Sequence, residues 1–339
     1  MDTIVLEEPG RFSFNDTELP GQLPDGHALV RIHRIGICGT DLHAYQGKQT
    51  FFSYPRILGH ELGLEISQVT DNDMGFSVGD LCTVEPFLSC GKCIACRQGK
   101  PNCCTDIKVL GVHTDGGMRD YMSVPIDKLH KSESLSLDQL AMVEPLAIGA
   151  HGVRRGGLEP GENILIIGVG PIGLTVAASA MVAGARIIVM DISEPRLAFC
   201  RVVMKVEHYV DNSQEIVGQL ESLCDGDLPT AVIDCTGNPQ SMAASFNYVA
   251  HGGRLIFVGH FPGDLTFNDA NFHMRELTLI GSRNAAPVDF KRVISLVEAG
   301  YIDVTSWITH RAPRDQVIES FPGWLDPDTG VVKVMVEWS

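Results

Sequence analysis

Four cysteines fall in one short stretch of the chain, at spacings that suit a metal ion. They are Cys90, Cys93, Cys96 and Cys104. Tetrahedral zinc takes four nitrogen or sulfur ligands, and Cys-x2-Cys turns bring neighbouring sulfurs to that geometry. Because four thiolates leave no open coordination position, we predict a structural zinc that holds a lobe of about residues 88–105. The spacing selects Cys104 over the adjacent Cys103, and nothing else in the sequence implies the electron transfer of an iron–sulfur cluster.

A glycine-rich turn between an apolar strand and a helix predicts a dinucleotide site. Its GxGxxG residues are Gly168, Gly170, Pro171, Ile172 and Gly173. The glycines allow a tight turn, close approach of the pyrophosphate and close packing of helix on strand, and the helix N-terminus faces the phosphates. Asp191 ends the next strand, where its carboxylate suits a ribose 2′-hydroxyl and repels a 2′-phosphate, so we expect NAD rather than NADP. Arg196 is a further expected cofactor contact, although its type also suits a solvated helix surface.

Three other segments carry residue types that bind a catalytic metal. GICGTDLHA contains Cys38, ILGHEL contains His60 and Glu61, and MVEPLAIGAH contains Glu144. Each also has an ordinary explanation: Cys38 as a core residue, His60 as a turn residue, and Glu144 as a charge at a helix N-terminus. The residue types alone leave both interpretations open.

The elements that position these residues change character near residue 150. Before it the chain is rich in glycine, proline and short β-like runs such as HALVRIHRIGIC. From Asn163 six strands alternate with mostly helical segments, which predicts a doubly wound parallel sheet. The uncharged segment Ile164–Ala185 resembles a membrane span, but its glycines and proline break the first half as a strand–turn–helix requires. After Gly281 a helix and mixed short elements follow, and they need not belong to the nucleotide fold.

Length and charge limit the class of protein. A chain of 339 residues is long enough for two domains. Its net charge of −16 and the lack of basic runs exclude nucleic acid and anionic membranes as partners. The N-terminus has neither a basic region nor a long apolar stretch, so we expect no secretory signal, a cytoplasmic location, and clustered thiols that bind metal rather than form disulfides.

Taken together, the motifs resemble the zinc-dependent medium-chain dehydrogenase/reductase superfamily over essentially the whole chain. They include GICGTDLHA, ILGHE, the cysteine lobe, DGGMRDYMSVP, EPLAIGAHGVRRGG and GVGPIG. The resemblance implies an α/β protein with a mostly-β, GroES-like catalytic domain (1–150), an NAD-binding Rossmann domain (151–281) and a C-terminal return to the catalytic domain (282–339). It also implies a homodimer or homotetramer built by pairing nucleotide-domain sheets.

The resemblance also assigns roles to the dispersed residues. Cys38 and His60 would bind a catalytic zinc, with Glu61 or Glu144 as the third ligand. Thr40 and His43 would carry the hydroxyl proton away through the cofactor ribose. One departure is visible, because the family's GHExxG pattern has Leu64 where glycine is expected and Gly63 just before it. The further expected cofactor contacts are Thr236, Val258, Gly259, Ser282 and Arg283.

The EPL context of Glu144 resembles the sorbitol/threonine dehydrogenase branch. FFSYPRILGHE, LGVHTDGG, HGGRLIFVGHF and GSRNAAPVDF resemble bacterial hexonate dehydrogenases, of the L-gulonate and L-galactonate 5-dehydrogenase kind. That match implies oxidation of C5 of L-gulonate to D-fructuronate, or of L-galactonate to D-tagaturonate. A hexonate carboxylate needs a local cation in this acidic chain, and Arg283 is the first candidate, followed by Asn284 and His113.

Three other functions compete with this interpretation. A polyol or L-threonine dehydrogenase would use the same zinc and NAD, and threonine also carries a carboxylate. A catalytically silent, NAD-sensing regulatory protein would be expected to lack Cys38, His60 or the Thr40–His43 pair, and all four residues are present. A zinc-free quinone reductase would be expected to lack the cysteine lobe.

Overall fold

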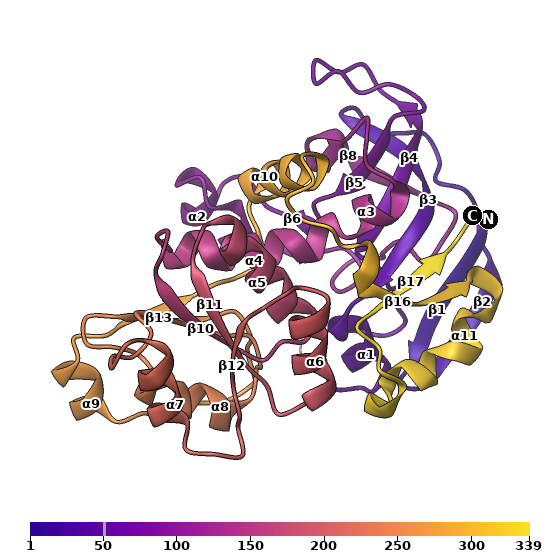
Figure 1. Ribbon diagram of the computed structural model, residues 1–339. Helices are drawn as coiled ribbons and strands as arrows, with labels where there is room; N and C mark the ends of the chain where they lie inside the picture. Colours follow the sequence, from indigo (N-terminus) through magenta and orange to yellow (C-terminus); the bar gives the residue numbers. More distant parts are fainter. Residues whose placement is uncertain (50–51) are drawn as a thin grey trace. The chain divides into compact units, whose positions relative to one another are not determined.

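The computed structural model describes residues 1–49 and 52–339. These residues form two compact units (Figure 1), one made of Met1–Glu144 with Ala286–Ser339 and the other of Pro145–Ala285. The sequence predicts domain boundaries after residues 150 and 281. In the structure the first change of unit falls inside helix α4 (Val143–Gly156), whose continuous helical pattern gives no sequence signal for it. The second falls after Ala285, just ahead of helix α10 (Pro287–Glu298).

A seven-stranded sheet is the centre of the first unit. Its strands are ordered β16-β17-β3-β4-β5-β9, and β8 pairs with β3. They are β3 (His27–Ile37), β4 (Glu61–Val69), β5 (Leu81–Val84), β8 (Tyr121–Pro125), β9 (Leu129–Lys131), β16 (Ile308–Pro313) and β17 (Lys333–Glu337). The long β3 pairs with β8 near its start and with β17 near its end. The chain after residue 286 therefore completes the sheet that the N-terminal part begins.

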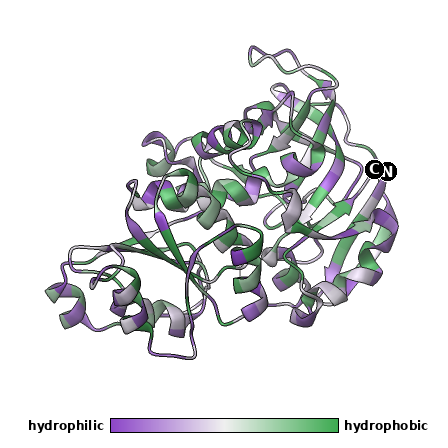
Figure 2. Cartoon of the chain, viewed as in Figure 1, coloured by the Kyte–Doolittle hydropathy of each residue, from purple (hydrophilic) through white to green (hydrophobic). Residues whose placement is uncertain are grey.

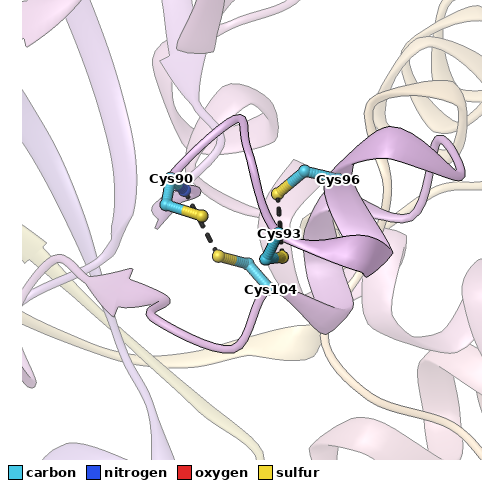
Figure 3. A group of neighbouring side chains, drawn as sticks. All are labelled: Cys90, Cys93, Cys96 and Cys104. Carbon is cyan, nitrogen blue, oxygen red and sulfur yellow. Dashed lines mark hydrogen bonds between the residues drawn. The ribbon is translucent and has the colours of Figure 1, made fainter.

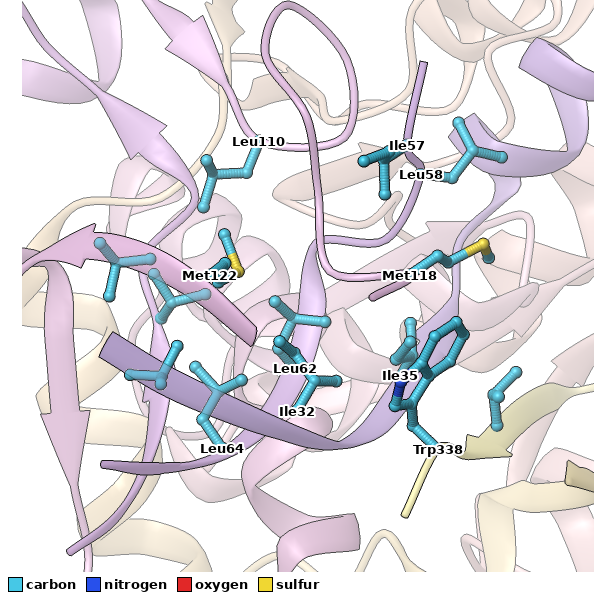
Figure 4. Close-up of a cluster of buried hydrophobic side chains, with 14 of the residues drawn as sticks. Ile32, Ile35, Ile57, Leu58, Leu62, Leu64, Leu110, Met118, Met122 and Trp338 are labelled. Carbon is cyan, nitrogen blue, oxygen red and sulfur yellow. The ribbon is translucent and has the colours of Figure 1, made fainter. Parts of the chain in front are cut away.

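Branched aliphatic side chains fill the core of this unit (Figure 4). Ile32, Leu62 and Leu64, on the adjacent strands β3 and β4, are fully buried. Gly63 lies between two of them and cannot be larger, because a Cβ there would lie 2.3 Å from the Leu137 carbonyl oxygen. This close approach explains the departure from the GHExxG pattern: the sheet needs glycine at 63 and a core side chain at 64.

Shorter elements complete the first unit. β1 (Asp2–Glu8) and β2 (Arg11–Asp16) form an antiparallel hairpin, and β6 (Phe87–Leu88) pairs with β7 (Lys108–Val109) on either side of the cysteine lobe. Besides α10, its helices are α1 (Gly39–Tyr45), α2 (Ile94–Arg97), α3 (Leu137–Ala141) and α11 (Val317–Ser320).

The second unit contains the six-stranded parallel sheet that the sequence predicted. Its order is β12-β11-β10-β13-β14-β15. The strands are β10 (Asn163–Ile167), β11 (Arg186–Met190), β12 (His208–Val210), β13 (Ala231–Asp234), β14 (Arg254–Phe257) and β15 (Thr278–Gly281). Besides α4, its helices are α5 (Pro171–Val182), α6 (Glu194–Val202), α7 (Ile216–Leu223), α8 (Pro239–Ala244) and α9 (Asp269–Met274). Apolar residues dominate the central strands (Figure 2), as expected when helices cover both faces of a parallel sheet.

In residues 1–49 and 52–339, no helix is both long enough and apolar enough to span a membrane. The uncharged segment Ile164–Ala185 forms β10, the glycine-rich turn and α5.

Candidate metal centres and nucleotide site

The four cysteines of the lobe point toward one another (Figure 3). All four sulfurs lie within 4.8 Å of one another, and Cys93 Sγ is 3.4 Å from Cys96 Sγ. The pKa of Cys93 falls to about 5, because backbone N–H groups of Cys96 and Thr105 donate to its sulfur. Burial raises the pKa of Cys96 to about 11. Four thiols so close, one of them already favoured as thiolate, fit a tetrahedral zinc ion.

Cys38, His60 and Glu61 form a second group with metal-ligand geometry. Their ligand atoms lie within 4.8 Å of one another. Cys38 is the N-cap of α1, and its sulfur accepts from the Thr40 backbone N–H at 3.5 Å. His60 and Glu61 are only 5% and 1% exposed, at the start of β4. The structure therefore brings together three residues that the sequence separates into two distant motifs.

Asp41 supports two members of this group. Its Oδ2 accepts from the Cys38 backbone N–H at 2.9 Å, and its Oδ1 lies 3.8 Å from His60 Nδ1. Burial raises the pKa of Asp41. Burial also opposes protonation of His60, but the charges of Asp41 and Cys38 outweigh it and raise the pKa of His60 well above 6.5. Asp41 therefore completes the capping box at the start of α1 and also lies within ion-pair distance of His60.

Lys333 is the site residue that sequence reasoning missed. Its Nζ donates to Glu61 Oε1 at 2.8 Å, to Oε2 at 2.7 Å and to the Ile37 carbonyl at 3.1 Å. Lys333 starts β17, and its neighbour Val334 pairs with Ile37 of β3. Gly36 leaves room for the ion pair, since a Cβ there would lie 2.1 Å from Glu61 Oε2. Only strand pairing across 272 residues brings Lys333 to Glu61, so no local motif could have revealed it.

Glu144 lies outside the 4.8 Å group but belongs to the same electrostatic environment. It is 4% exposed, in the first turn of α4. Burial raises its pKa to about 7, while the charge of His60 lowers the pKa and that of Glu61 raises it. A buried carboxylate with this pKa would be stabilised as an anion by a nearby cation.

The expected proton carriers share one short helix. Thr40 is half-buried and His43 is exposed, both on α1. Residues three positions apart lie on the same side of a helix, so the two side chains can act in sequence.

The glycine-rich turn of the second unit has the geometry that its sequence predicts. Gly168 has φ 82°, in the left-handed region that favours glycine. A Cβ on Gly173 would lie 1.9 Å from the Gly168 carbonyl oxygen, so the turn can close onto α5 only with glycine there. Gly170 is the N-cap of α5, and Pro171 and Ile172 begin the helix. The N–H groups at the start of this helix can therefore face a pyrophosphate.

Asp191 borders a cavity of about 770 Å³ at the ends of β11 and β12. Its Oδ2 accepts from the Val169 N–H and its Oδ1 from the Ser193 N–H, each at 2.8 Å. Arg196 lies 3.8 Å from Asp191 and is half exposed. The aspartate is thus held rigidly beside a space large enough for part of a dinucleotide.

The remaining expected cofactor contacts follow the carboxyl ends of three neighbouring strands. Thr236 follows β13, Val258 and Gly259 follow β14, and Ser282 and Arg283 follow β15. Ligands of open parallel sheets bind at this edge. Of the three candidate substrate contacts, Arg283 and Asn284 belong to the second unit. His113 belongs to the first unit, where its Nδ1 accepts from the Val109 N–H at 3.1 Å.

Comparison with known proteins identifies the same family in both units. The alcohol dehydrogenase GroES-like domain model matches residues 24–134, and the zinc-binding dehydrogenase model matches residues 171–299. Zinc and NAD, the cofactors that the sequence predicted, are typical of zinc-binding dehydrogenases. The matches also confirm the predicted combination of a GroES-like domain with a Rossmann-type sheet.

Individual relatives match over nearly the full length. The chain is 40% identical to the L-galactonate-5-dehydrogenase of Escherichia coli, over 95% of this chain and 94% of the relative. It is 32% identical to the D-altritol 5-dehydrogenase of Agrobacterium fabrum, over 95% of each. The crystal structure of the alcohol dehydrogenase RspB from Escherichia coli, complexed with NADH, matches with a TM-score of 0.92 at 30% identity, covering 100% of this chain and 99% of that one.

Proposed function

Because the chain belongs to the zinc-binding dehydrogenase family, we propose that it oxidises a secondary hydroxyl of a sugar acid, with one catalytic zinc, one structural zinc and NAD. The observation that carries the proposal is the 40% identity to L-galactonate-5-dehydrogenase. It favours C5 of L-galactonate, with D-tagaturonate as product. L-gulonate, oxidised to D-fructuronate, is the other hexonate that the sequence predicted.

In the proposed reaction Cys38, His60 and one carboxylate hold the catalytic zinc. When bound, zinc supplies electrophilic stabilisation to a hydroxyl that loses its proton. Asp41 fixes the Cys38 backbone and faces His60, so it holds both ligands in place. Thr40 accepts the hydroxyl proton as it gives up its own, and His43 accepts a proton in turn and releases it to solvent. A histidine suits this task because its ordinary pKa lies near neutral pH.

The third ligand is Glu144 in this proposal. Both oxygens of Glu61 already accept from Lys333, so Glu61 could bind the metal only by giving up a buried ion pair. Glu144 forms no salt bridge within the described residues, and its raised pKa shows that burial disfavours its anion there. A zinc ion would remove that penalty, so binding through Glu144 costs less than binding through Glu61.

A polyol dehydrogenase is the second candidate function. The 32% identity to D-altritol 5-dehydrogenase supports it, because altritol has no carboxylate. A preference for substrates that carry a carboxylate would therefore distinguish a sugar-acid dehydrogenase from a polyol dehydrogenase.

We also propose that copies of the chain associate into a homodimer or homotetramer. β15 is an edge strand of the second unit's sheet, and its Leu279 is 40% exposed. An open edge of this kind can pair with another strand. Light scattering at micromolar concentration tests this; a mass of 36.8 kDa, that of one chain, would contradict it.

The substrate is tested by NADH formation over a matched panel of L-galactonate, L-gulonate, galactitol, sorbitol and L-threonine. The proposal expects the highest kcat/KM on a hexonate. Equal values on hexonates and neutral polyols would favour the polyol function, and turnover of threonine alone would contradict both.

A further inference from the structure

Two arginines and one aspartate form a cluster in the first unit that the proposed chemistry does not use. Arg56 Nη1 donates to Asp115 Oδ1 at 3.0 Å, and Arg119 Nη2 donates to the Asp115 carbonyl at 3.5 Å. Within the described residues Arg119 forms no salt bridge. The Nε atoms of Arg56 and Arg119 are both buried and lack a hydrogen-bond partner there. The cluster therefore has two positive charges and one negative charge.

A local excess of positive charge is unusual in a chain that is acidic overall. The protein has 42 acidic and 26 basic residues, yet among the described residues only the Asp115 carboxylate pairs with either of these two guanidinium groups. Burial lowers the pKa of Arg119, and Asp115 only partly opposes that effect. A poorly paired cation withdrawn from water is costly, and groups with perturbed pKa values cluster at functional sites.

The cluster is fixed beside the segment that leads to His60. The Gly116, Gly117 and Met118 N–H groups donate to the carbonyls of Ile57, Gly59 and Leu58 at 2.8–2.9 Å. A Cβ on Gly116 would lie 2.3 Å from the Gly59 carbonyl oxygen, so the close approach depends on glycine. The turn that carries Asp115 and Arg119 is thus bonded to the three residues that precede a catalytic metal ligand.

The backbone of strand β1 pairs with the backbone of both arginines. Leu6 pairs with Arg56 through two backbone hydrogen bonds, at 2.8 and 3.0 Å, and Thr3 pairs with Arg119. Two guanidinium groups on rigid backbone are preorganised for an anion, because little ordering is left to occur on binding.

We propose that Arg119 and Arg56 bind the carboxylate of the sugar-acid substrate, which makes them its specificity-determining cations. This inference rests on the proposed function and names the residues that recognise its carboxylate. The single excess charge matches a monovalent carboxylate better than a doubly charged phosphate. A guanidinium presents two parallel N–H groups to a carboxylate, and Asp115 orients Arg56 without cancelling both charges. Arg283, the candidate from sequence, lies in the other unit and is tested separately.

Steady-state kinetics with L-galactonate test the proposal. Arg119→Met loses a charge-assisted hydrogen bond, so its KM should rise at least about tenfold. The rise should be smaller in Arg119→Lys, because lysine keeps the positive charge but lacks the two parallel N–H donors of a guanidinium. Asp115→Asn keeps an oxygen acceptor for Arg56 and removes the negative charge of Asp115 from the cluster, so the KM of this variant should fall. The matched control is Arg292→Met, an exposed arginine of α10, with the KM of the wild type. An unchanged KM in Arg119→Met, or a tenfold rise only in Arg283→Met, overturns the assignment.

Melting temperature provides a readout that does not need turnover. The zinc-loaded wild type should be stabilised by L-galactonate and not by galactitol, its carboxylate-free counterpart, and Arg119→Met should lose the stabilisation. Stabilisation by inorganic phosphate but not by L-galactonate would overturn the substrate assignment. Stabilisation by L-galactonate that depends on Arg119 but without NADH formation would support the carboxylate site and contradict the proposed function. Equal stabilisation of wild type and Arg119→Met would contradict the site alone.

Discussion

Lys333 holds both carboxylate oxygens of Glu61, at 2.8 and 2.7 Å, directly beside the candidate ligands Cys38 and His60. Both partners are almost fully buried, at 3% and 1% side-chain exposure. The ion pair engages both oxygens of Glu61 and connects strand β17 to the candidate metal site.

Loss of Lys333 should strongly destabilise the protein. Lys333→Met leaves a buried, unpaired carboxylate, which costs about 3–5 kcal/mol of the free energy of unfolding. Urea denaturation measures the loss. The double variant Glu61→Gln with Lys333→Met removes both charges and should recover much of it. A loss below about 1 kcal/mol in the single variant would argue against the buried ion pair.

The two candidate third ligands can be separated by metal content. If Glu144 is the ligand, Glu144→Gln should retain about one zinc per chain after dialysis, because one of three protein ligands is gone. The control is the double variant Glu61→Gln with Lys333→Met, which removes both charges of the buried ion pair and should keep about two. Elemental analysis measures both, and the reverse pattern would assign the ligand to Glu61.

The cysteine lobe offers a similarly matched pair. Cys93→Ser removes one of four thiolates and should lose the structural zinc, which lowers the melting temperature by about 5 °C or more. Cys103→Ser changes the exposed neighbouring thiol and should leave both the zinc content and the melting temperature unchanged. If the two variants behave alike, the lobe does not bind zinc through these four cysteines.

Glu144 should also make the stability of the metal-free protein depend on pH. Its pKa is raised from 4.5 to about 7 in the folded state, so the folded protein holds the proton more tightly than the unfolded chain does. Its contribution to the free energy of unfolding is therefore most favourable below pH 4.5 and is lost as the pH rises to about 7, by up to about 3 kcal/mol. Denaturation in EDTA should show this loss in the wild type but not in Glu144→Gln. Parallel pH profiles would contradict the raised pKa.

Asp191 should set the choice of cofactor. Asp191→Asn keeps an oxygen acceptor and removes the charge that repels a 2′-phosphate, so the ratio of kcat/KM for NADP to that for NAD should rise about tenfold or more. Asp264→Asn, a change of the same charge at an exposed position of the same unit, should leave the ratio unaltered. A ratio that does not respond to Asp191→Asn would show that other residues discriminate the two cofactors.

The sequence predicted those features in which chemistry and spacing are local. The GxGxxG turn and the cysteine lobe each lie within one short segment of the sequence, so their residue types and spacing alone indicate their geometry. Family resemblance was needed to connect Cys38 with His60. Lys333 escaped prediction because its role depends on β17 pairing with β3. The requirement for glycine at position 63 depends on the approach of Leu137 from α3, which no local pattern encodes.

We propose above all that Cys38 and His60 hold the zinc ion that is needed when NAD oxidises a hexonate. The most direct measurement is NADH formation from L-galactonate by the zinc-loaded wild type, by His60→Ala and by the control Cys103→Ser. The wild type and Cys103→Ser should produce NADH with one equivalent of D-tagaturonate. His60→Ala should bind NAD normally but form NADH at least about a hundredfold more slowly, because a metal ligand is missing. Full activity of His60→Ala, or of the wild type stripped of all metal, would contradict the claim.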